Sequence, residues 1–315
     1  MSPRPLLSIV MPVHNGADWL ATTFDSLLGE VSELVEIIVL DSSPDLRTAT
    51  LVETYANRLP ITFLRRPDLQ AWTAKTNLGV EIAKADYACM LHQDDLWLSG
   101  RLAIVRNWIS ADPEAALHLG PTAIIDRDGT RLGSWRCPLP IGRRLSEREV
   151  LQSLLVQNFI SVPAPVFRRD AWQQCGGMDE ALWYTADWDL WLKLSGAGPV
   201  RYHEQETTAF RVHGSSLTVT GCRDLDEFEA QMQVVFERHA PRIPQPRSNV
   251  ESAARASIRV NVELAAASSG SPGALARACW QILSLGPSGA RRYLKDSRLL
   301  DRVLPRVRAR LAGVF

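Results

Sequence analysis

Short apolar runs alternate with segments of helical periodicity along the first third of the chain. The runs are rich in β-branched residues and lack polar alternation, as expected for parallel strands that are covered on both faces. They lie at residues 8–13, 35–40, 61–65 and 87–91. Apolar residues spaced three and four apart predict helices between them, at residues 18–28, 46–56 and 71–83. This alternation predicts an α/β fold with a doubly wound, mostly parallel sheet and flanking helices.

The pattern is less regular over the next stretch of the chain. Helical spacing recurs at residues 98–111, 146–155, 170–175 and 187–194. The segment at residues 146–155 begins with Ser146 and Glu149, which are spaced as a capping box. Two further strands are expected, at residues 117–125 and, interrupted by two prolines, at 162–167. The turn residues at 126–129 (DRDG) predict a hairpin.

Beyond about residue 220 the pattern predicts helices alone. A proline-rich linker at residues 241–246 follows the first of them, and the expected helices span residues 225–239, 251–268, 274–285 and 289–313. We therefore predict two units. Residues 1–220 form the α/β domain, and residues 221–315 form a helical C-terminal region.

Composition narrows the classes of protein to which the chain can belong. Lys+Arg and Asp+Glu both number 35, which argues against a nucleic-acid-binding protein with a basic surplus. The five cysteines include no CxxC pair, which argues against a disulfide framework or a structural zinc site and fits a reducing compartment. The N-terminal apolar stretch is too short for a signal peptide, and no run reaches the length of a membrane span. We expect a cytoplasmic protein.

Carboxylates follow the predicted strands where ligands of such sheets bind. Asp41 follows the second strand, and Asp94 and Asp95 follow the fourth. Two adjacent carboxylates at a poorly solvated strand end repel each other, and a divalent cation would relieve this repulsion and hold a diphosphate. The alternative is that the pair only caps the next helix, with Asp95 as the N-cap. Asp187 opens a later helical segment.

Five segments, in chain order, resemble motifs of the family 2 glycosyltransferases, which have the GT-A fold. The first two are SIVMPVHN at residues 8–15 and EIIVLDSSPD at 36–45. The third runs from NLGV at residue 77 to LHQDD, which ends at residue 95. The fourth pairs GGMDE at residue 176 with ADWDLWL at 186, and the last is FRVH at 210–213. Together they cover residues 6 to 220, so the chain resembles this family over the whole predicted α/β domain.

The resemblance implies a role for each carboxylate. Asp41 would accept a hydrogen bond from the nucleobase, with uracil expected, and Asp94 would bind the ribose or share the metal. Asp95 would hold Mg²⁺ or Mn²⁺ against the diphosphate, and Asp187 would be the general base. Pro12 and His14, in the first motif, would line the nucleotide site.

The reaction implied is a single in-line displacement that inverts the anomeric carbon. The donor would be a nucleotide-sugar, and the acceptor a hydroxyl of a glycan or of a lipid-linked sugar. Cell-surface polysaccharide biosynthesis is the expected process.

Three positions depart from the family pattern. His92 stands where the first Asp of the DxDD motif is usual. It either contacts the ligand as a neutral imidazole or is packed in the sheet, and the packed interpretation is favoured. Ala186 replaces the usual Glu before the base, and His14 replaces a Tyr that stacks on the nucleobase. The core carboxylates are retained.

Four more residues are candidates for contacts with the diphosphate or the acceptor. Arg211 and His213 suit phosphate chemically, although they would be only a surface pair if they lay on a loop. Lys75 is a weaker phosphate candidate, because a lysine on a helix surface is usually just solvated. Trp188 belongs to an aromatic group around Asp187 that offers a platform for an acceptor sugar or is simply part of the core.

The C-terminal stretch, residues 291–315, combines eight basic residues with two acidic ones. Its apolar residues repeat at helical spacing, so it predicts either an interfacial helix on an anionic membrane or a packed amphipathic helix. The first interpretation would place the protein peripherally on the inner face of the membrane.

Two other functions compete with glycosyl transfer. A sugar-nucleotide pyrophosphorylase should carry a glycine-rich loop after the first strand, where this chain has only Gly16. A non-catalytic nucleotide-sugar or glycan-binding protein would have lost part of the active site. The joint presence of Asp41, Asp94, Asp95 and Asp187 argues against such a loss.

Overall fold

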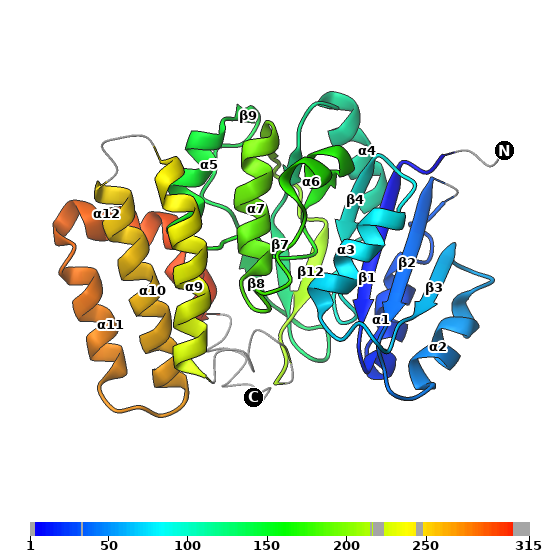
Figure 1. The fold of residues 1–315 in the computed structure, drawn as a ribbon, viewed down its shortest axis with the longest axis horizontal. Coiled ribbons are helices and arrows are strands. Elements are labelled where there is room, and N and C mark those ends of the chain that lie inside the picture. The colour runs from blue at the N-terminus through cyan, green and yellow to red at the C-terminus, as the bar shows by residue number, and fades with distance from the viewer. Residues whose placement is uncertain (1–3, 33, 215, 217–223, 244–247, 305–315) are drawn as a thin grey trace.

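The computed structural model describes residues 4–32, 34–214, 216, 224–243 and 248–304 of the chain. A large sheet with its helices occupies one side of the molecule, and a group of long C-terminal helices occupies the other (Figure 1). The cores of both parts are joined, since one apolar cluster extends from Val10 in the sheet to Ile258 among the C-terminal helices. The predicted boundary near residue 220 falls outside the described residues and stays a prediction.

The first half of the large sheet is parallel, as predicted. Its four neighbouring strands lie in the order β3-β2-β1-β4. Their bounds are Leu7–Val13 for β1, Val35–Asp41 for β2, Ile61–Arg65 for β3 and Tyr87–Met90 for β4. The predicted helices connect them as α1 (Leu20–Leu27), α2 (Arg47–Tyr55) and α3 (Trp72–Ile82). A short 3₁₀ turn, η1 (Gly16–Asp18), precedes α1.

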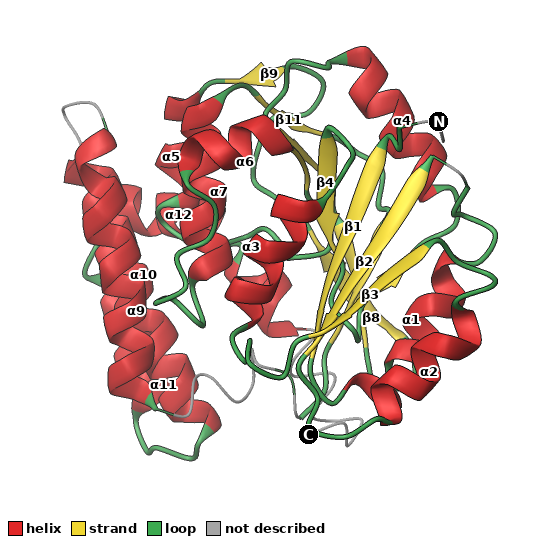
Figure 2. Ribbon diagram, turned by 45° about the vertical axis from the view of Figure 1, so that its right-hand side comes forward, coloured by secondary structure: helices red, strands yellow, loops and turns green. Residues whose placement is uncertain are grey.

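Both faces of this half-sheet are buried, which explains why its strands are apolar without alternation. Ile9 and Met11 of β1 belong to the cluster that contains Phe24 of α1. Val10, between them, points to the other face and belongs to the cluster that contains Val80 of α3. Figure 2 shows α1 and α2 on one side of the strands and α3 on the other.

The second half of the large sheet is mixed. The order continues from β4 through β10 (Val166–Arg168), β6 (Leu117–Leu119) and β11 (Val200–Tyr202) to β9 (Arg144–Leu145). Strand β10 runs antiparallel to both of its neighbours. The strand predicted over residues 162–167 is therefore mostly wrong, because two prolines cannot donate ladder hydrogen bonds and only its last residues pair.

A second, four-stranded sheet has the order β5-β12-β7-β8. Its strands are β5 (Leu96–Trp97), β7 (Thr122–Ile125), β8 (Arg131–Trp135) and β12 (Thr208–Arg211). The single strand predicted over residues 117–125 is wrong, because the chain leaves the large sheet at Gly120, where a Cβ would lie 2.8 Å from the Gln205 carbonyl oxygen. The predicted hairpin turn after Ile125 is confirmed by the antiparallel pairing of β7 with β8.

Four helices complete the described portion of the α/β part. They are α4 (Arg101–Ala111), α5 (Glu147–Leu154), α6 (Arg169–Cys175) and α7 (Ala186–Ala197). The capping box predicted at Ser146 and Glu149 begins α5. Helix α7 packs against α5 and α6 and carries Asp187 in its first turn.

The C-terminal helices are α9 (Leu225–His239), α10 (Ser248–Ser268), α11 (Ala274–Leu283) and α12 (Gly286–Ser297), with the turn η2 (Ala240–Arg242) after α9. Helix α10 packs against the other three. Among the described residues, no helix has the length and apolar character needed to cross a membrane.

The single helix predicted over residues 289–313 is wrong in its described part. Helix α12 ends at Ser297, because Arg298 takes a left-handed conformation with φ 47°. Tyr293 is fully buried, whereas Leu294 beside it is half exposed. Helix α12 is thus packed on one side and open on the other, and residues 305–315 lie outside the described part of the chain.

Candidate active site

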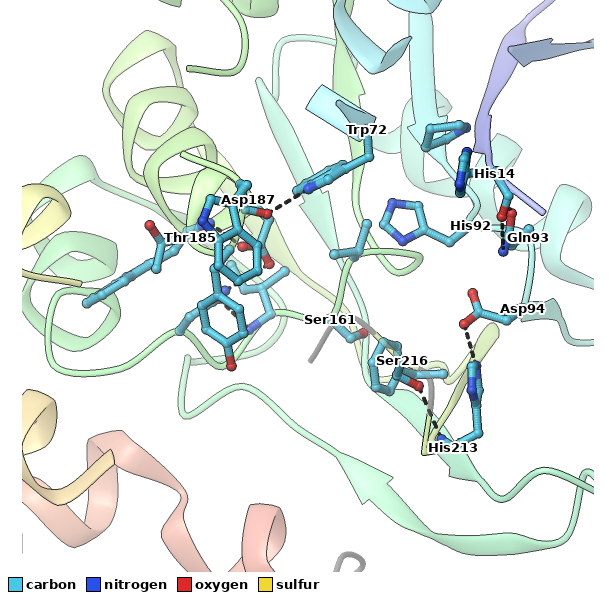
Figure 3. Close-up of a pocket in the computed structure, with 18 of the residues that line it drawn as sticks. His14, Trp72, His92, Gln93, Asp94, Ser161, Thr185, Asp187, His213 and Ser216 are labelled. Atoms are coloured by element: carbon cyan, nitrogen blue, oxygen red, sulfur yellow. Dashed lines mark hydrogen bonds and ion pairs between the residues drawn. The ribbon is translucent and has the colours of Figure 1, made fainter. Parts of the chain in front are cut away.

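A cavity of about 850 Å³ lies at the carboxyl ends of β1 and β4 and extends to the first turn of α7 and to the C-terminal helices. Pro12, His14 and Asp94 line one end, which we call the nucleotide end. Asp187 lines the other end, which we call the acceptor end. Figure 3 shows His14 and Asp94 on one side of the cavity and Asp187 across from them.

The backbone at the nucleotide end is held by side chains from neighbouring loops. The Gln93 amide accepts from the His14 backbone N–H at 2.9 Å and donates to the His14 carbonyl at 3.1 Å. The His14 ring lies with Nδ1 3.1 Å from the Ser42 hydroxyl. The loops after β1, β2 and β4 therefore form one connected rim, as their predicted place at the sheet edge requires.

Asp41 lies behind this rim rather than on the cavity wall. Its side chain is fully buried, and Oδ1 accepts hydrogen bonds from the backbone N–H and the hydroxyl of Ser43. Its Oδ2 atom is buried and has no hydrogen-bond partner among the described residues. The sequence prediction grouped His14, Asp41 and Asp94 in one cleft, and only His14 and Asp94 line it.

Lys75 is buried near Asp41 and also lines the cavity. Its Nζ donates to the Val13 carbonyl and to the Ser42 hydroxyl, both at 2.7 Å, and the side chain lines the cavity. Burial lowers the pKa of the Lys75 ammonium to about 8, and the nearby Asp41 charge opposes this shift. The alternative of a merely solvated surface lysine is wrong, because Lys75 is only 1% exposed.

Asp94 and Asp95 have different surroundings. Asp94 lines the cavity, and its Oδ2 lies 2.9 Å from Nε2 of His213. Asp95 is buried outside the cavity lining, and its Oδ1 accepts from the Arg211 backbone N–H at 3.0 Å. Burial, followed by the charge of Asp94, raises the pKa of Asp95 well above the usual carboxyl range. Asp95 does not cap the next helix either, since α4 begins after Gly100.

Arg211 and His213 are both buried, so the alternative of a surface pair is wrong. The Arg211 guanidinium donates to the backbone carbonyls of Asp94, Asp126 and Arg127 and does not line the cavity. His213 does line it, stacked on the Trp19 ring with centroids 4.5 Å apart. Of this pair, only His213 is placed to touch a ligand.

His92 lies on the cavity wall, so the favoured interpretation of a residue packed in the sheet is wrong. Its ring meets the edge of Trp72 at a centroid distance of 5.3 Å. Burial lowers the pKa of His92, which keeps the imidazole neutral. Its Nε2 is buried without a hydrogen-bond partner among the described residues. Figure 3 shows the ring between Trp72 and Asp94.

Asp187 is held at the acceptor end by hydrogen bonds to both of its carboxylate oxygens. Its Oδ2 accepts from the Asn158 amide at 2.9 Å, and Oδ1 accepts from the Trp188 backbone N–H at 2.8 Å. Burial raises the pKa of Asp187 to about 6 despite these hydrogen bonds. Trp188 lines the cavity with a small part of its surface and donates its indole N–H to the Leu154 carbonyl, so most of it belongs to the core.

Asp189, two residues further along α7, points away from the cavity and is fully buried. It accepts from His239 at 2.8 Å and pairs with Lys193 at 2.7 Å and Arg238 at 2.9 Å. Burial alone would raise its pKa, but His239 and Lys193 hold the pKa of Asp189 at about 2. This carboxylate joins α7 to α9.

Sequence reasoning missed a series of polar side chains on the acceptor wall. The Gln157 amide oxygen accepts from Asn261 at 2.8 Å, and the Asn261 oxygen accepts from Arg302 at 2.8 Å. Together with Asn158 these residues line the cavity from Asp187 towards the C-terminal helices. No sequence signal marks them, because they come from separate helices and loops and form no local motif.

Aromatic residues line the same end. Trp183 and Tyr184, which the sequence placed near the base, are on the wall, whereas Trp191 is fully buried in the core. Trp72 and Trp135 also line the cavity, from distant segments of the chain. Trp72 donates its indole N–H to the Trp183 carbonyl at 2.7 Å, which ties α3 to the loop before α7.

Comparison with known proteins gives a family match. The model of the family described as glycosyl transferase family 2 matches residues 8–173, more than half of the chain. An uncharacterized glycosyltransferase of Rickettsia prowazekii is 27% identical over 233 residues, which cover 71% of this chain and 70% of the relative. A chondroitin synthase of Escherichia coli is 24% identical over 217 residues, which cover 68% of this chain but 30% of that protein.

Two solved structures have the same fold. One is Staphylococcus aureus TarS in complex with UDP-GlcNAc, with a TM-score of 0.58 and 13% identity over 93% of this chain and 92% of that one. The other is a mannosyltransferase from Pyrobaculum calidifontis in complex with GDP-Man and Mn²⁺. Its TM-score is 0.54 and its identity is 17%, and the match covers 97% of this chain and 87% of the mannosyltransferase. These likenesses confirm the GT-A fold with additional C-terminal helices.

Proposed function

Because the chain belongs to glycosyl transferase family 2 and is a glycosyltransferase, we propose that it moves a sugar from a nucleotide diphosphate to a glycan hydroxyl with inversion. The observation that carries the proposal is the pairing of two unlike ends in one cavity. Asp94 and His213 form a polar pair at the nucleotide end, and Asp187, with a pKa of about 6, lies at the acceptor end. The family match removes the support for a pyrophosphorylase or a non-catalytic binding protein.

We propose a UDP-sugar as the donor. The two similar structures bind UDP-GlcNAc and GDP-Man, so the fold alone leaves the base open. Asp41 is enclosed behind the rim, so we propose that it supports base recognition indirectly, through its hydrogen bonds to Ser43 and its charge near Lys75. Lys75, beside it, reaches the cavity and favours a polar group there. His14 offers an aromatic face in place of the family's Tyr.

A divalent cation, Mg²⁺ or Mn²⁺, fits the Asp94–His213 pair. The carboxylate is a hard oxygen ligand, and the imidazole nitrogen lies 2.9 Å from it on the same wall. No cluster of three metal-binding side chains exists among the described residues, so the diphosphate and water would supply the remaining ligands. We propose Asp94 rather than Asp95 as the direct contact, because Asp95 is enclosed. When bound, such a cation stabilises the leaving diphosphate.

Asp187 is proposed to accept the proton of the acceptor hydroxyl. A pKa of about 6 leaves it mostly ionised near neutral pH yet more basic than an ordinary carboxylate. The described carboxylates that line the cavity are Asp18, Asp94 and Asp187, and Asp18 is paired with Arg47 at 2.8 Å. With Asp94 paired to His213, no second carboxylate is positioned as a nucleophile, which favours a single inverting displacement.

The acceptor end has the chemistry of a glycan site. Amides of Asn158, Gln157 and Asn261 offer paired donors and acceptors for hydroxyl groups, and Trp183 and Tyr184 offer flat apolar faces. A sugar presents both kinds of surface. A free glycan and a lipid-linked glycan share this chemistry, and a cytoplasmic location remains part of the proposal.

The test begins with a thermal-shift screen of UDP- and GDP-sugars in the presence of Mn²⁺ or Mg²⁺. With the stabilising donor, transfer is then measured for the wild type and for Asp187→Asn. Loss of a general base should lower kcat by about a hundred- to ten-thousandfold. Donor affinity should stay unchanged, since Asp187 is not at the nucleotide end. The matched control is Asp18→Asn, another cavity carboxylate, which should keep near wild-type turnover.

Near wild-type turnover in Asp187→Asn would exclude it as the base. A fall in donor affinity in that variant would mean that the two ends of the cavity are wrongly assigned.

A further inference from the structure

Helix α11 presents an apolar face to the outside of the molecule. It packs inward through Ala274 and Ala278, one turn apart. Residues Cys279, Trp280 and Leu283 point the other way, and the last two are each 69% exposed. Their spacing is that of one helix face, so the side chains form a contiguous strip. Figure 1 shows α11 at the outer edge of the helical group, with no described element on its outer side.

Exposed large apolar side chains are concentrated in this part of the described chain. The structure has ten of them, and six fall between residues 275 and 304. They are Leu275, Trp280, Leu283, Leu294, Leu300 and Leu304. Single exposed apolar residues are normal on a soluble surface, but a group on neighbouring helices marks a contact surface.

Positive charge is concentrated in the same region. From residue 274 to the end, the sequence has nine Lys and Arg against two Asp and Glu, a surplus of seven. The preceding 273 residues carry the remaining 26 basic and 33 acidic residues, a deficit of seven. The chain is therefore neutral overall, but its C-terminal part is basic and the preceding part is acidic.

The basic and apolar residues meet on the open side of α12. Arg291, Leu294 and Lys295 are spaced three and four apart and are all exposed. Tyr293 and Asp296 face inward and are buried. Helix α12 packs against α11, so the basic side chains of α12 and the apolar strip of α11 belong to neighbouring helices.

We propose that α11 and α12 form a surface that rests on an anionic lipid membrane. We define this membrane surface by Trp280, Leu283 and Leu294 together with Arg291 and Lys295. The apolar side chains would enter the interface between headgroups and acyl chains, and Trp280 would keep its N–H at headgroup level. The two basic residues would meet lipid phosphates.

A second copy of the chain is a poorer occupant of this surface. A symmetric dimer brings the same patch of each subunit together. Arg291 and Lys295 of both subunits would then share one interface, and like charges repel most where water is excluded. An anionic membrane instead pairs these charges with opposite ones while burying the same apolar strip.

The placement has a consequence for the cavity. The helical group that carries the membrane surface also supplies Asn261 and Arg302 to the acceptor wall. A protein docked through α11 and α12 would thus hold its acceptor end close to glycans attached to lipid. The docking itself does not depend on the proposed function.

The experiment is flotation of the full chain with phosphatidylcholine vesicles, with and without about a third of phosphatidylglycerol. Wild-type protein should float with the anionic vesicles at low salt, less at high salt, and weakly with the neutral ones. The double variant Trp280→Ser, Leu283→Ser should lower binding at least tenfold. The double variant Arg291→Gln, Lys295→Gln should bind anionic and neutral vesicles equally weakly.

The matched control is Leu46→Ser, because Leu46 is 61% exposed and lies at the start of α2, in the α/β part. It should float as the wild type does, and equal thermal melts would show that all variants are folded. Wild-type protein that stays at the bottom, or variants that float unchanged, would overturn the proposal. A dimer in light scattering that Trp280→Ser, Leu283→Ser disrupts would replace the membrane by a second copy.

Discussion

The two ends of the cavity are built in different ways. The nucleotide end comes from the end of β1 and from the loops after β1 and β4, so the parallel pairing of these strands brings Pro12, His14 and Asp94 together. The acceptor end combines Asn158, Asp187 and residues of α10 and beyond, which only helix packing brings together. The first end is thus a consequence of sheet topology, and the second depends on how the C-terminal helices dock.

Helix α7 shows how this docking is secured. Asp187 faces the cavity, whereas Asp189 is held by α9 through His239. Arg242 approaches Nδ1 of His239 at 2.6 Å, and a guanidinium can only donate. His239 is therefore the neutral tautomer with its proton on Nε2, which donates to Asp189. Asp187, the proposed base, is thus positioned by a helix whose other side is fixed to the helical region.

The largest effect is expected from a substitution that breaks the attachment of α7 to α9. Asp189→Ala leaves the partly buried cations without their partner and should lower the free energy of unfolding by about 3 kcal/mol. Urea denaturation measures it. Because the pKa of Asp189 is held below its usual 3.8, its contribution is present above that pH and is lost as the pH falls towards 2.

The control for that change is Asp179→Ala, which removes a more exposed partner of the same Arg238. It should cost about 1 kcal/mol or less. Equal costs for the two variants would show that Asp189 does not anchor α7.

The next largest effect should distinguish the roles of the adjacent carboxylates Asp94 and Asp95. Asp94→Asn should lower kcat about a hundredfold and abolish the Mn²⁺ dependence of donor affinity, because it removes the charge that faces the cavity. Calorimetry of UDP with and without Mn²⁺ measures the second quantity. Asp95→Asn should keep that dependence, since an amide oxygen can still accept from the Arg211 N–H. If Asp95→Asn loses it instead, the original assignment of the metal to Asp95 is restored.

A pH profile tests whether the ends titrate separately. Protonation of Asp187 removes the base, so kcat should fall about tenfold for each pH unit below about 6. Donor affinity should show no step at that pH. A flat kcat profile between pH 5 and 7, or a parallel step in donor affinity, would contradict the assignment of Asp187 as a base that acts only at the acceptor end.

The smallest effect tests the helical contribution to the acceptor wall. Asn261→Ala removes one hydrogen-bonding group and should raise the acceptor KM about fivefold with little change in kcat. Steady-state kinetics at saturating donor measures both. Ser268→Ala, on the same helix and outside the cavity lining, is the control. An unchanged KM in Asn261→Ala would confine the acceptor site to the α/β domain.

The sequence by itself determined the family, the parallel half of the sheet and the residues at its edge. Strands covered on both faces are apolar throughout, so the carboxylates Asp41 and Asp94 at their ends are visible as local patterns. Asp187 is visible at the start of a helical pattern. The sequence also indicated the C-terminal helices, because their periodicity is local.

Only the tertiary structure decided which side chains reach the cavity. Asp94 and Asp95 are neighbours in sequence, yet the pairing of β12 with β5 encloses Asp95 against Arg211 and leaves Asp94 beside His213. Periodicity likewise could not show that His92 and Lys75 lie on the cavity wall. Asn261 joins the wall by bonding Gln157, 104 residues away in the sequence, and Arg302 joins it by bonding Asn261, 41 residues away. Such contacts leave no trace in local spacing. Periodicity records whether a side chain is buried, but not what it is buried against.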